Sequence, residues 1–118
     1  MAATKTAKTL GVSASLAAAT SRNESEWNLS TAYGGIVGVK LTNSATAPTT
    51  APVVKIFVGE ATGIKRLLYQ ASGDTTNSSV NDIVCEIPAG AMFVNITITN
   101  GATNAITAES YGQELTAI

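Results

Sequence analysis

The segment 87–100 constrains the fold of this chain more than any other. It opens with a Pro-Ala-Gly turn and continues as an alternation of apolar and polar residues, with Met92, Val94, Ile96 and Ile98 in one phase. Apolar residues at every second position are typical of a β-strand that buries one face. The segment therefore predicts a strand that packs on a core through the face that carries these four side chains.

Similar apolar stretches recur along the chain and are separated by loops rich in Pro, Gly, Asn and Ser. We expect strands at residues 9–19, 33–42, 53–58, 64–72, 81–87, 91–99 and 106–114, and a strand or a loop at 27–31. No long amphipathic helix interrupts this pattern. Seven or eight short strands at near-regular spacing predict an all-β fold, a two-sheet antiparallel sandwich of jelly-roll or immunoglobulin-like type.

The length of 118 residues suffices for one hydrophobic core. Residues 1–8 are small, polar and mildly basic, so we expect a flexible N-terminal arm there and a single β-sandwich domain at 9–118. The stretch 10–19 is diluted by serine and glycine, so we expect no secretory signal in it. No apolar run approaches the roughly 20 residues of a membrane span, and we expect no membrane contact.

Charge is sparse and unevenly placed. Charged residues make up 13% of the chain, about half the usual share of roughly 25%. A weakly charged surface costs little to desolvate and suits packing against other subunits, although a secreted or structural β protein would share it. All seven basic residues lie in the first 66 positions, which carry a formal charge of +4, whereas residues 67–118 carry −5. Separation of these halves in space would favour head-to-tail contacts, and the absence of a dense basic stripe argues against nucleic-acid binding.

Little in the sequence points to catalysis. The chain contains no histidine, and general acid–base chemistry usually employs histidine or carboxylates held in a cleft. Glu24 and Glu26 form the nearest acidic pair, and we expect both to be solvated in a polar turn. Cys85 is in phase with Ile83 and Ile87, which predicts a buried apolar side chain and not a reactive thiol. We therefore expect no enzymatic activity, no catalytic residue, no cofactor, no metal site and no small-molecule substrate.

The aromatic residues suggest contact with a partner. Phe57 and Phe93 occupy the phase opposite the aliphatic residues of their strands, so these strands are expected to be covered on both faces, within the sandwich or by another subunit. Lysines near the N-terminus could in turn contact an acidic neighbouring subunit. The candidate interface residues are Lys5, Lys8, Trp27, Tyr33 and Phe93.

One combination of segments carries a family resemblance. Residues 33–58 join a glycine-bearing strand, the Thr-Asn-Ser-Ala-Thr-Ala-Pro-Thr loop at 42–49 and a second strand, and residues 87–94 place an Ile-Pro-Ala-Gly turn before another strand. This combination of strands, loop and turn, which covers roughly residues 30–112, resembles the small β-sandwich virion structural proteins of tailed bacteriophages, in particular the capsid decoration (cement) proteins. The segment 1–29 lies outside it.

The resemblance implies a non-enzymatic protein that stabilises a phage head by bridging major capsid subunits. It also implies self-association, with a homotrimer as the expected state, synthesis in the host cytoplasm and a final location on the capsid surface of the virion. The competing interpretation is a carbohydrate- or receptor-binding β-sandwich module of a fibre or adhesin, in which exposed aromatic rings and Asn/Asp loops would contact a sugar.

Overall fold

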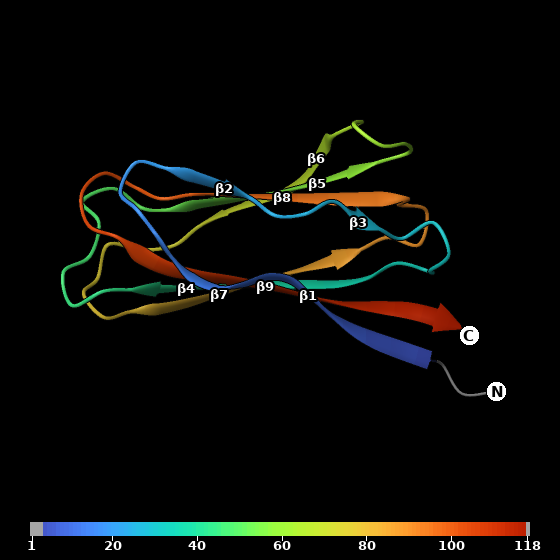
Figure 1. The fold of residues 1–118 in the computed structure, drawn as a ribbon, viewed down its shortest axis with the longest axis horizontal. Helices are drawn as coiled ribbons and strands as arrows, with labels where there is room; N and C mark the ends of the chain where they lie inside the picture. Colours follow the sequence, from blue (N-terminus) through green and yellow to red (C-terminus); the bar gives the residue numbers. More distant parts are fainter. Residues whose placement is uncertain (1–3, 118) are drawn as a thin grey trace.

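The computed structural model describes residues 4–117, which form nine strands and no helix (Figure 1). The strands are β1 (Thr4–Leu16), β2 (Ser21–Asn23), β3 (Trp27–Asn28), β4 (Gly35–Asn43), β5 (Val53–Gly59), β6 (Arg66–Ser72), β7 (Val80–Ile87), β8 (Phe93–Thr99) and β9 (Ile106–Ala117). The all-β class expected from the alternating pattern is confirmed.

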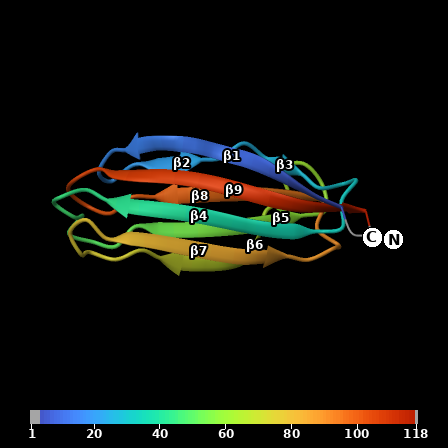
Figure 2. The ribbon, with the colours of Figure 1, turned by 90° about the horizontal axis from the view of Figure 1, so that it is seen from below.

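The strands of residues 4–117 form two antiparallel sheets packed face to face. Sheet A has the order β1-β9-β4-β7, and sheet B has the order β2-β8-β5-β6, with β3 also paired to β8. Figure 2 shows the two layers superposed, with β9 in front of β8 and β4 in front of β5. The expected two-sheet sandwich is therefore confirmed.

The order of pairing identifies the sandwich as a jelly roll. Strand β5 pairs with β6, β4 with β7, β2 and β3 with β8, and β1 with β9, so the chain forms one long antiparallel ribbon whose tip is the β5–β6 hairpin. The ribbon wraps on itself until β4 meets β9 and β5 meets β8. This nesting is the jelly-roll arrangement, one of the two architectures that the strand spacing allowed.

The core lies between the inner faces of the two sheets. Its buried side chains follow the predicted alternation on the central strands: Val37, Val39, Leu41, Val54, Ile56, Val94, Ile96, Ile98, Ile106 and Ala108. Met92 departs from the prediction, because β8 begins at Phe93, two residues later than expected, and leaves the Met92 side chain 38% exposed.

Trp27 belongs to this core, which corrects its expected role as an interface residue. Its side chain is 1% exposed, and its strand pairs with β8 opposite Val94. The indole ring lies over Gly112 of β9, where a Cβ atom would come within 2.7 Å of the ring carbon Cη2. Trp27 therefore fills the space above a glycine and links the two sheets.

The predicted arm is also corrected. Residues 4–8 form the first part of β1 and pair with β9, for example Lys5 with Leu115 and Lys8 with Gly112. The expected boundary before Thr9 is thus absent, while residues 1–3 lie outside the described residues. This part of β1 is exposed and, with the end of β9, extends past the sandwich (Figure 1).

We predict that Gly112→Ala lowers the free energy of unfolding by about 1–3 kcal/mol, because the added methyl group forces Trp27 or β9 to shift. Gly38→Ala on β4 is the matched control, since a Cβ there meets nothing within 4 Å. The control should leave stability unchanged or raise it by up to about 1 kcal/mol. Equilibrium urea unfolding measures both variants, and equal effects would contradict the packing described.

Candidate interaction surfaces

A polar network crosses the outer face of sheet A. Lys40 Nζ on β4 lies 3.8 Å from Glu109 Oε1 on β9, and the Tyr111 hydroxyl donates a 2.8 Å hydrogen bond to Glu109 Oε2. This hydrogen bond to the carboxylate, followed by burial, raises the pKa of Tyr111, because both favour the protonated phenol. The network fixes the Tyr111 ring on the sheet surface.

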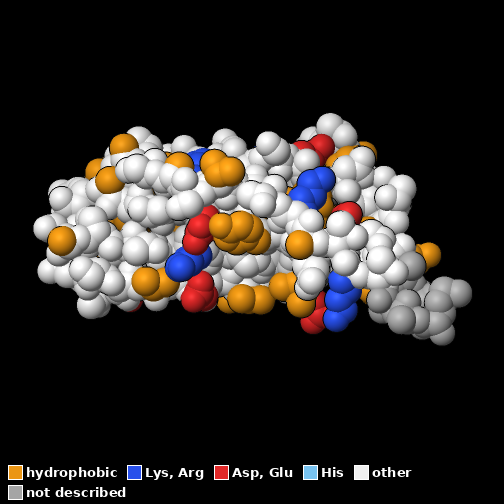
Figure 3. Space-filling model, turned by 60° about the horizontal axis from the view of Figure 1, so that its bottom comes forward, with side chains coloured by type: hydrophobic (Ala, Val, Ile, Leu, Met, Phe, Trp, Pro, Cys, Tyr) orange, Lys and Arg blue, Asp and Glu red, His pale blue; other side chains and the backbone are white. Residues whose placement is uncertain are grey.

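Apolar side chains surround the network. Val84 of β7 is 63% exposed, and Ile36, Val80 and Tyr111 are about half exposed. In register, Gly38 separates Val84 from Tyr111 and leaves the space above the sheet open. Figure 3 shows this face, with apolar patches beside a small group of charges. The outer face of sheet A thus presents apolar surface that no described element covers.

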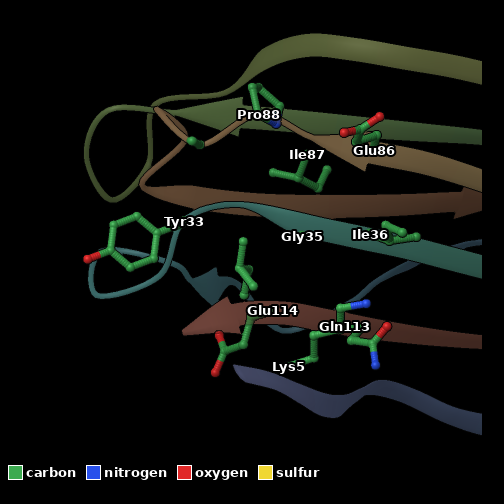
Figure 4. Close-up of a pocket in the computed structure, with 11 residues that line it drawn as sticks. Lys5, Tyr33, Gly35, Ile36, Glu86, Ile87, Pro88, Gln113 and Glu114 are labelled. Carbon is green, nitrogen blue, oxygen red and sulfur yellow. The ribbon is translucent and has the colours of Figure 1, made fainter. Parts of the chain in front are cut away.

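A groove of about 320 Å³ lies where β1 and β9 leave the sandwich (Figure 4). Lys5, Tyr33, Glu86 and Glu114 are among the residues that line it. The loop before β4 is held there because Tyr33 N donates to Leu115 O at 2.7 Å. Two predicted interface residues, Lys5 and Tyr33, therefore line the same groove although they are distant in sequence.

A second apolar surface lies on β6, the edge strand of sheet B. We define the β6 strip as Ile64, Leu67, Leu68 and Tyr69, all of which are exposed. Leu67, Leu68 and Tyr69 are consecutive in the chain, and a register shift opposite β5 interrupts the alternation of the strand at Leu68. Both faces of the strand are consequently open to solvent.

An ion pair closes the loop of the β5–β6 hairpin. Arg66 Nε donates to Glu60 Oε1 at 2.7 Å, and this hydrogen bond holds the pKa of Glu60 below its usual value. The pair neutralises Arg66, and residues 67–72 carry no charge. Leu67, Leu68 and Tyr69 therefore form an uncharged apolar edge, whereas a basic residue, Lys65, lies between Ile64 and Arg66 in the loop before β6.

The remaining predicted interface residues lie apart from the groove. Lys8 is exposed on β1, and Phe93 is half-buried on the outer face of sheet B, where it pairs with Gly59 and Asn28. Phe93 is thus outside the core, as its phase predicted, but it belongs to the sheet opposite Lys5 and Tyr33. The five predicted residues do not form one site.

The expectation that Glu24 is solvated is wrong. Its side chain is 2% exposed and lies beneath β1, where Arg22 Nε donates to Glu24 Oε1 at 2.6 Å. Arg22 also donates to the carbonyl of Ala108, in the region where β1 is out of register with β9. The pair fits because position 11 is glycine, since a Cβ atom at this position would collide with the Glu24 carboxylate.

Within residues 4–117 no group of three or more His, Cys, Asp or Glu side chains is placed to hold a metal ion. Cys85 is buried, as predicted, and burial raises the pKa of its thiol. The same part of the chain contains no helix long and apolar enough to cross a membrane.

Asp74, in the loop between β6 and β7, organises one end of the sandwich. Its Oδ1 accepts hydrogen bonds from Asn43 Nδ2 at 2.9 Å and from Thr76 N at 3.1 Å, and its Oδ2 accepts one from Ser79 Oγ at 2.8 Å. The Ser79 hydroxyl, followed by the Thr76 amide, lowers the pKa of Asp74 because both stabilise the carboxylate. The loop is therefore tied to β4 through an ionised aspartate.

We predict that Asp74→Asn lowers the melting temperature at neutral pH and that the difference from wild type shrinks in acid. The folded-state pKa is depressed, so the stabilisation is complete above the ordinary value of 3.8 and disappears as pH falls through the folded pKa. Circular dichroism melting between pH 7 and pH 2 measures the difference. Asp82→Asn on the exposed face of β7 is the control, and a difference for Asp74→Asn that does not depend on pH would contradict the assignment.

No family model and no curated protein sequence matches this chain. Solved structures do. A chain from Bacillus endospore appendages, which form disulfide-linked pili, has 15% identity and a TM-score of 0.59, and the match covers 100% of this chain and 93% of that one. A chain of the infectious bursal disease virus Gx strain has 12% identity and a TM-score of 0.65, with 96% of this chain and 32% of that chain covered.

The SPBc2 prophage-derived protein YomS has 16% identity and a TM-score of 0.54, and the match covers 96% of each chain. At these identities the likeness extends to the β-sandwich fold. The fold of this chain is thus one that also occurs in a virus, in a prophage protein and in a pilus.

Proposed function

We propose that this chain is a non-enzymatic structural protein of a bacteriophage virion, and specifically a capsid decoration (cement) protein that bridges major capsid subunits on the capsid surface. The observation that carries the proposal is the exposed apolar surface of a weakly charged jelly roll, on the outer face of sheet A and on the β6 strip. Contiguous apolar surface on a small protein marks a contact with another macromolecule. The occurrence of the same fold in viral and prophage proteins supports this proposal.

The proposed contact with the capsid uses the β6 strip. Leu67, Leu68 and Tyr69 are uncharged neighbours on a hairpin that stands at the edge of sheet B (Figure 1), and Ile64 lies in the loop of this hairpin beside Lys65. Burial of apolar surface contributes roughly 25 cal/mol per Å², so one such strip gives a weak contact. Repetition of weak contacts by the symmetry of a capsid raises the total affinity.

The proposal includes self-association, with a homotrimer as the state that the family resemblance implies. Cys85 is buried, so contacts between copies would be non-covalent. The competing sugar-binding function loses an anchor, because the core position of Trp27 removes it from the surface on which a sugar could stack.

Capsids assembled without this protein, mixed with purified protein and sedimented, test the proposal. We predict that wild-type protein co-sediments and that the double variant Leu67→Lys/Leu68→Lys binds at least tenfold more weakly, because two charges replace the exposed apolar side chains of the strip. Val12→Lys is the matched control, since Val12 is 70% exposed on β1, at the other edge of the sandwich.

Absence of co-sedimentation at every salt concentration would reject the cement function. Capsid binding that is equally weakened by the Val12→Lys control would reject the β6 strip as the contact. A glycan array signal that Tyr33→Ala removes would favour the sugar-binding alternative instead.

A further inference from the structure

We propose that the two edges of sheet A are the complementary halves of one contact between copies of this chain: β7 of one copy pairs with residues 5–9 of β1 in the next, and sheet A continues from copy to copy. The contact involves neither the β6 strip nor a capsid. It can therefore be tested separately from capsid binding, and it supplies a contact for the self-association that the proposed function includes.

Both edges have the form that strand pairing requires. Among the described residues, β1 and β7 each have a sheet neighbour on one side alone. Residues 5–9 of β1 pair with β9 without a register shift, and β7 pairs with β4 without one along its whole length. An unpaired, regular edge presents a row of free backbone donors and acceptors to another strand. The rest of β1 is bulged, so the regular edge is confined to its first part.

The directions of β1 and β7, and their positions along the strand axis of sheet A, also suit pairing between copies. Adjacent strands in sheet A are antiparallel, so β1 and β7 run in opposite directions, and two copies in the same orientation bring them together as an antiparallel pair. The register across the sheet places Glu86, Ile36, Gln113 and Ala7 in one row. A copy displaced sideways along the sheet therefore sets Glu86 opposite Ala7.

The charges of the two edges complement each other. Strand β1 contains Lys5 and Lys8 and no acidic residue, whereas β7 contains Asp82 and Glu86 and no basic residue. Lys8 lies on the other face of the sheet, in the row of Gly112, Val37 and Cys85, so Lys5 is the lysine on the face of Glu86. Lys5 lies on the same strand face as Ala7, so it would be the diagonal neighbour of Glu86, at about 7–8 Å between backbones and within reach of a long side chain. Across one molecule, Lys5 and Glu86 stand on opposite sides of the groove (Figure 4).

These charges also select the type of contact. Within residues 4–117, Lys5, Lys8 and Glu86 form no ion pair, so each is available to a partner. Two β1 edges would bring lysines together without a carboxylate, and two β7 edges would bring carboxylates together without a lysine, and like charges directly opposite each other are unfavourable. The remaining combination joins unlike edges. Such a head-to-tail contact closes into a ring where the rotation between copies allows it and otherwise continues as a filament.

Charge reversal tests the contact in the isolated protein. By sedimentation velocity at low salt, Glu86→Lys and Lys5→Glu should each weaken association at least tenfold, and a mixture of the two variants should restore it, because each supplies the edge that the other needs. Asp82→Lys makes the same charge change on the same face of β7, at the level where β1 is bulged. We expect less than a threefold effect from this control.

Thermal unfolding of every variant verifies that the fold is retained. Association that survives both reversals, or a mixture that remains monomeric, would overturn the proposal. A monomeric wild-type protein at low salt and high concentration would overturn it as well, whatever the protein does on a capsid.

Cysteine cross-linking tests the pairing itself. Thr9 and Val84 lie in one row of sheet A, at its two edges, so the contact brings Thr9 of one copy close to Val84 of the next. In a Cys85→Ala background, a Thr9→Cys protein mixed with a Val84→Cys protein should form disulfide-linked heterodimers on oxidation. Homodimers formed by either protein alone in comparable yield would show a contact between like edges and would overturn the head-to-tail arrangement.

Discussion

The packing of the four central strands against each other supports every other part of the molecule. Strands β4 and β9 in sheet A, and β5 and β8 in sheet B, alternate buried apolar and outward-facing residues, so each sheet turns one apolar face inward. Two such faces leave water by packing together. The edge strands take their positions from hydrogen bonds to these four. The core therefore determines where the exposed surfaces lie, although the exposed side chains contribute little to the core.

The two long edges of the sandwich differ in how their strands are shielded from solvent. Beneath β1 and β2, the ion pair of Arg22 and Glu24 fills the gap between the sheets, and the bulges of β1 adapt the strand to it. At the opposite edge β6 exposes both of its faces, and β7 exposes valines between carboxylates. Edge strands in native proteins are usually shielded by charges, bulges or covering loops. A regular edge with apolar side chains is consequently a place where a partner is expected.

Local pattern predicted the strands and the core, and long-range pairing decided what local pattern could not. The alternation in 37–41 and 94–98 fixed which residues are buried, because a strand has only two faces. The choice between jelly roll and immunoglobulin-like sandwich depended on which distant strands pair, and strand spacing is the same in both. Glu24 was misassigned because its short polar segment resembles a turn, and its ion pair forms under a strand far away in sequence. The groove could not be predicted from the sequence for the same reason, because Lys5 and Tyr33 are brought together by their separate contacts with β9.

The insertion of β9 between β1 and β4 has a consequence for folding. Sheet A contains no β1–β4 pairing, so β1 can join the sheet only through a strand near the other end of the chain, and Thr4 pairs with Ala117. Pairings between residues so distant in sequence are slow to form, because the chain must close a long loop first. During synthesis β1 therefore has no strand in sheet A to pair with, and β4 can pair only with β7, until β9 has left the ribosome. We therefore expect sheet A to be completed late, once β9 can pair with both β1 and β4.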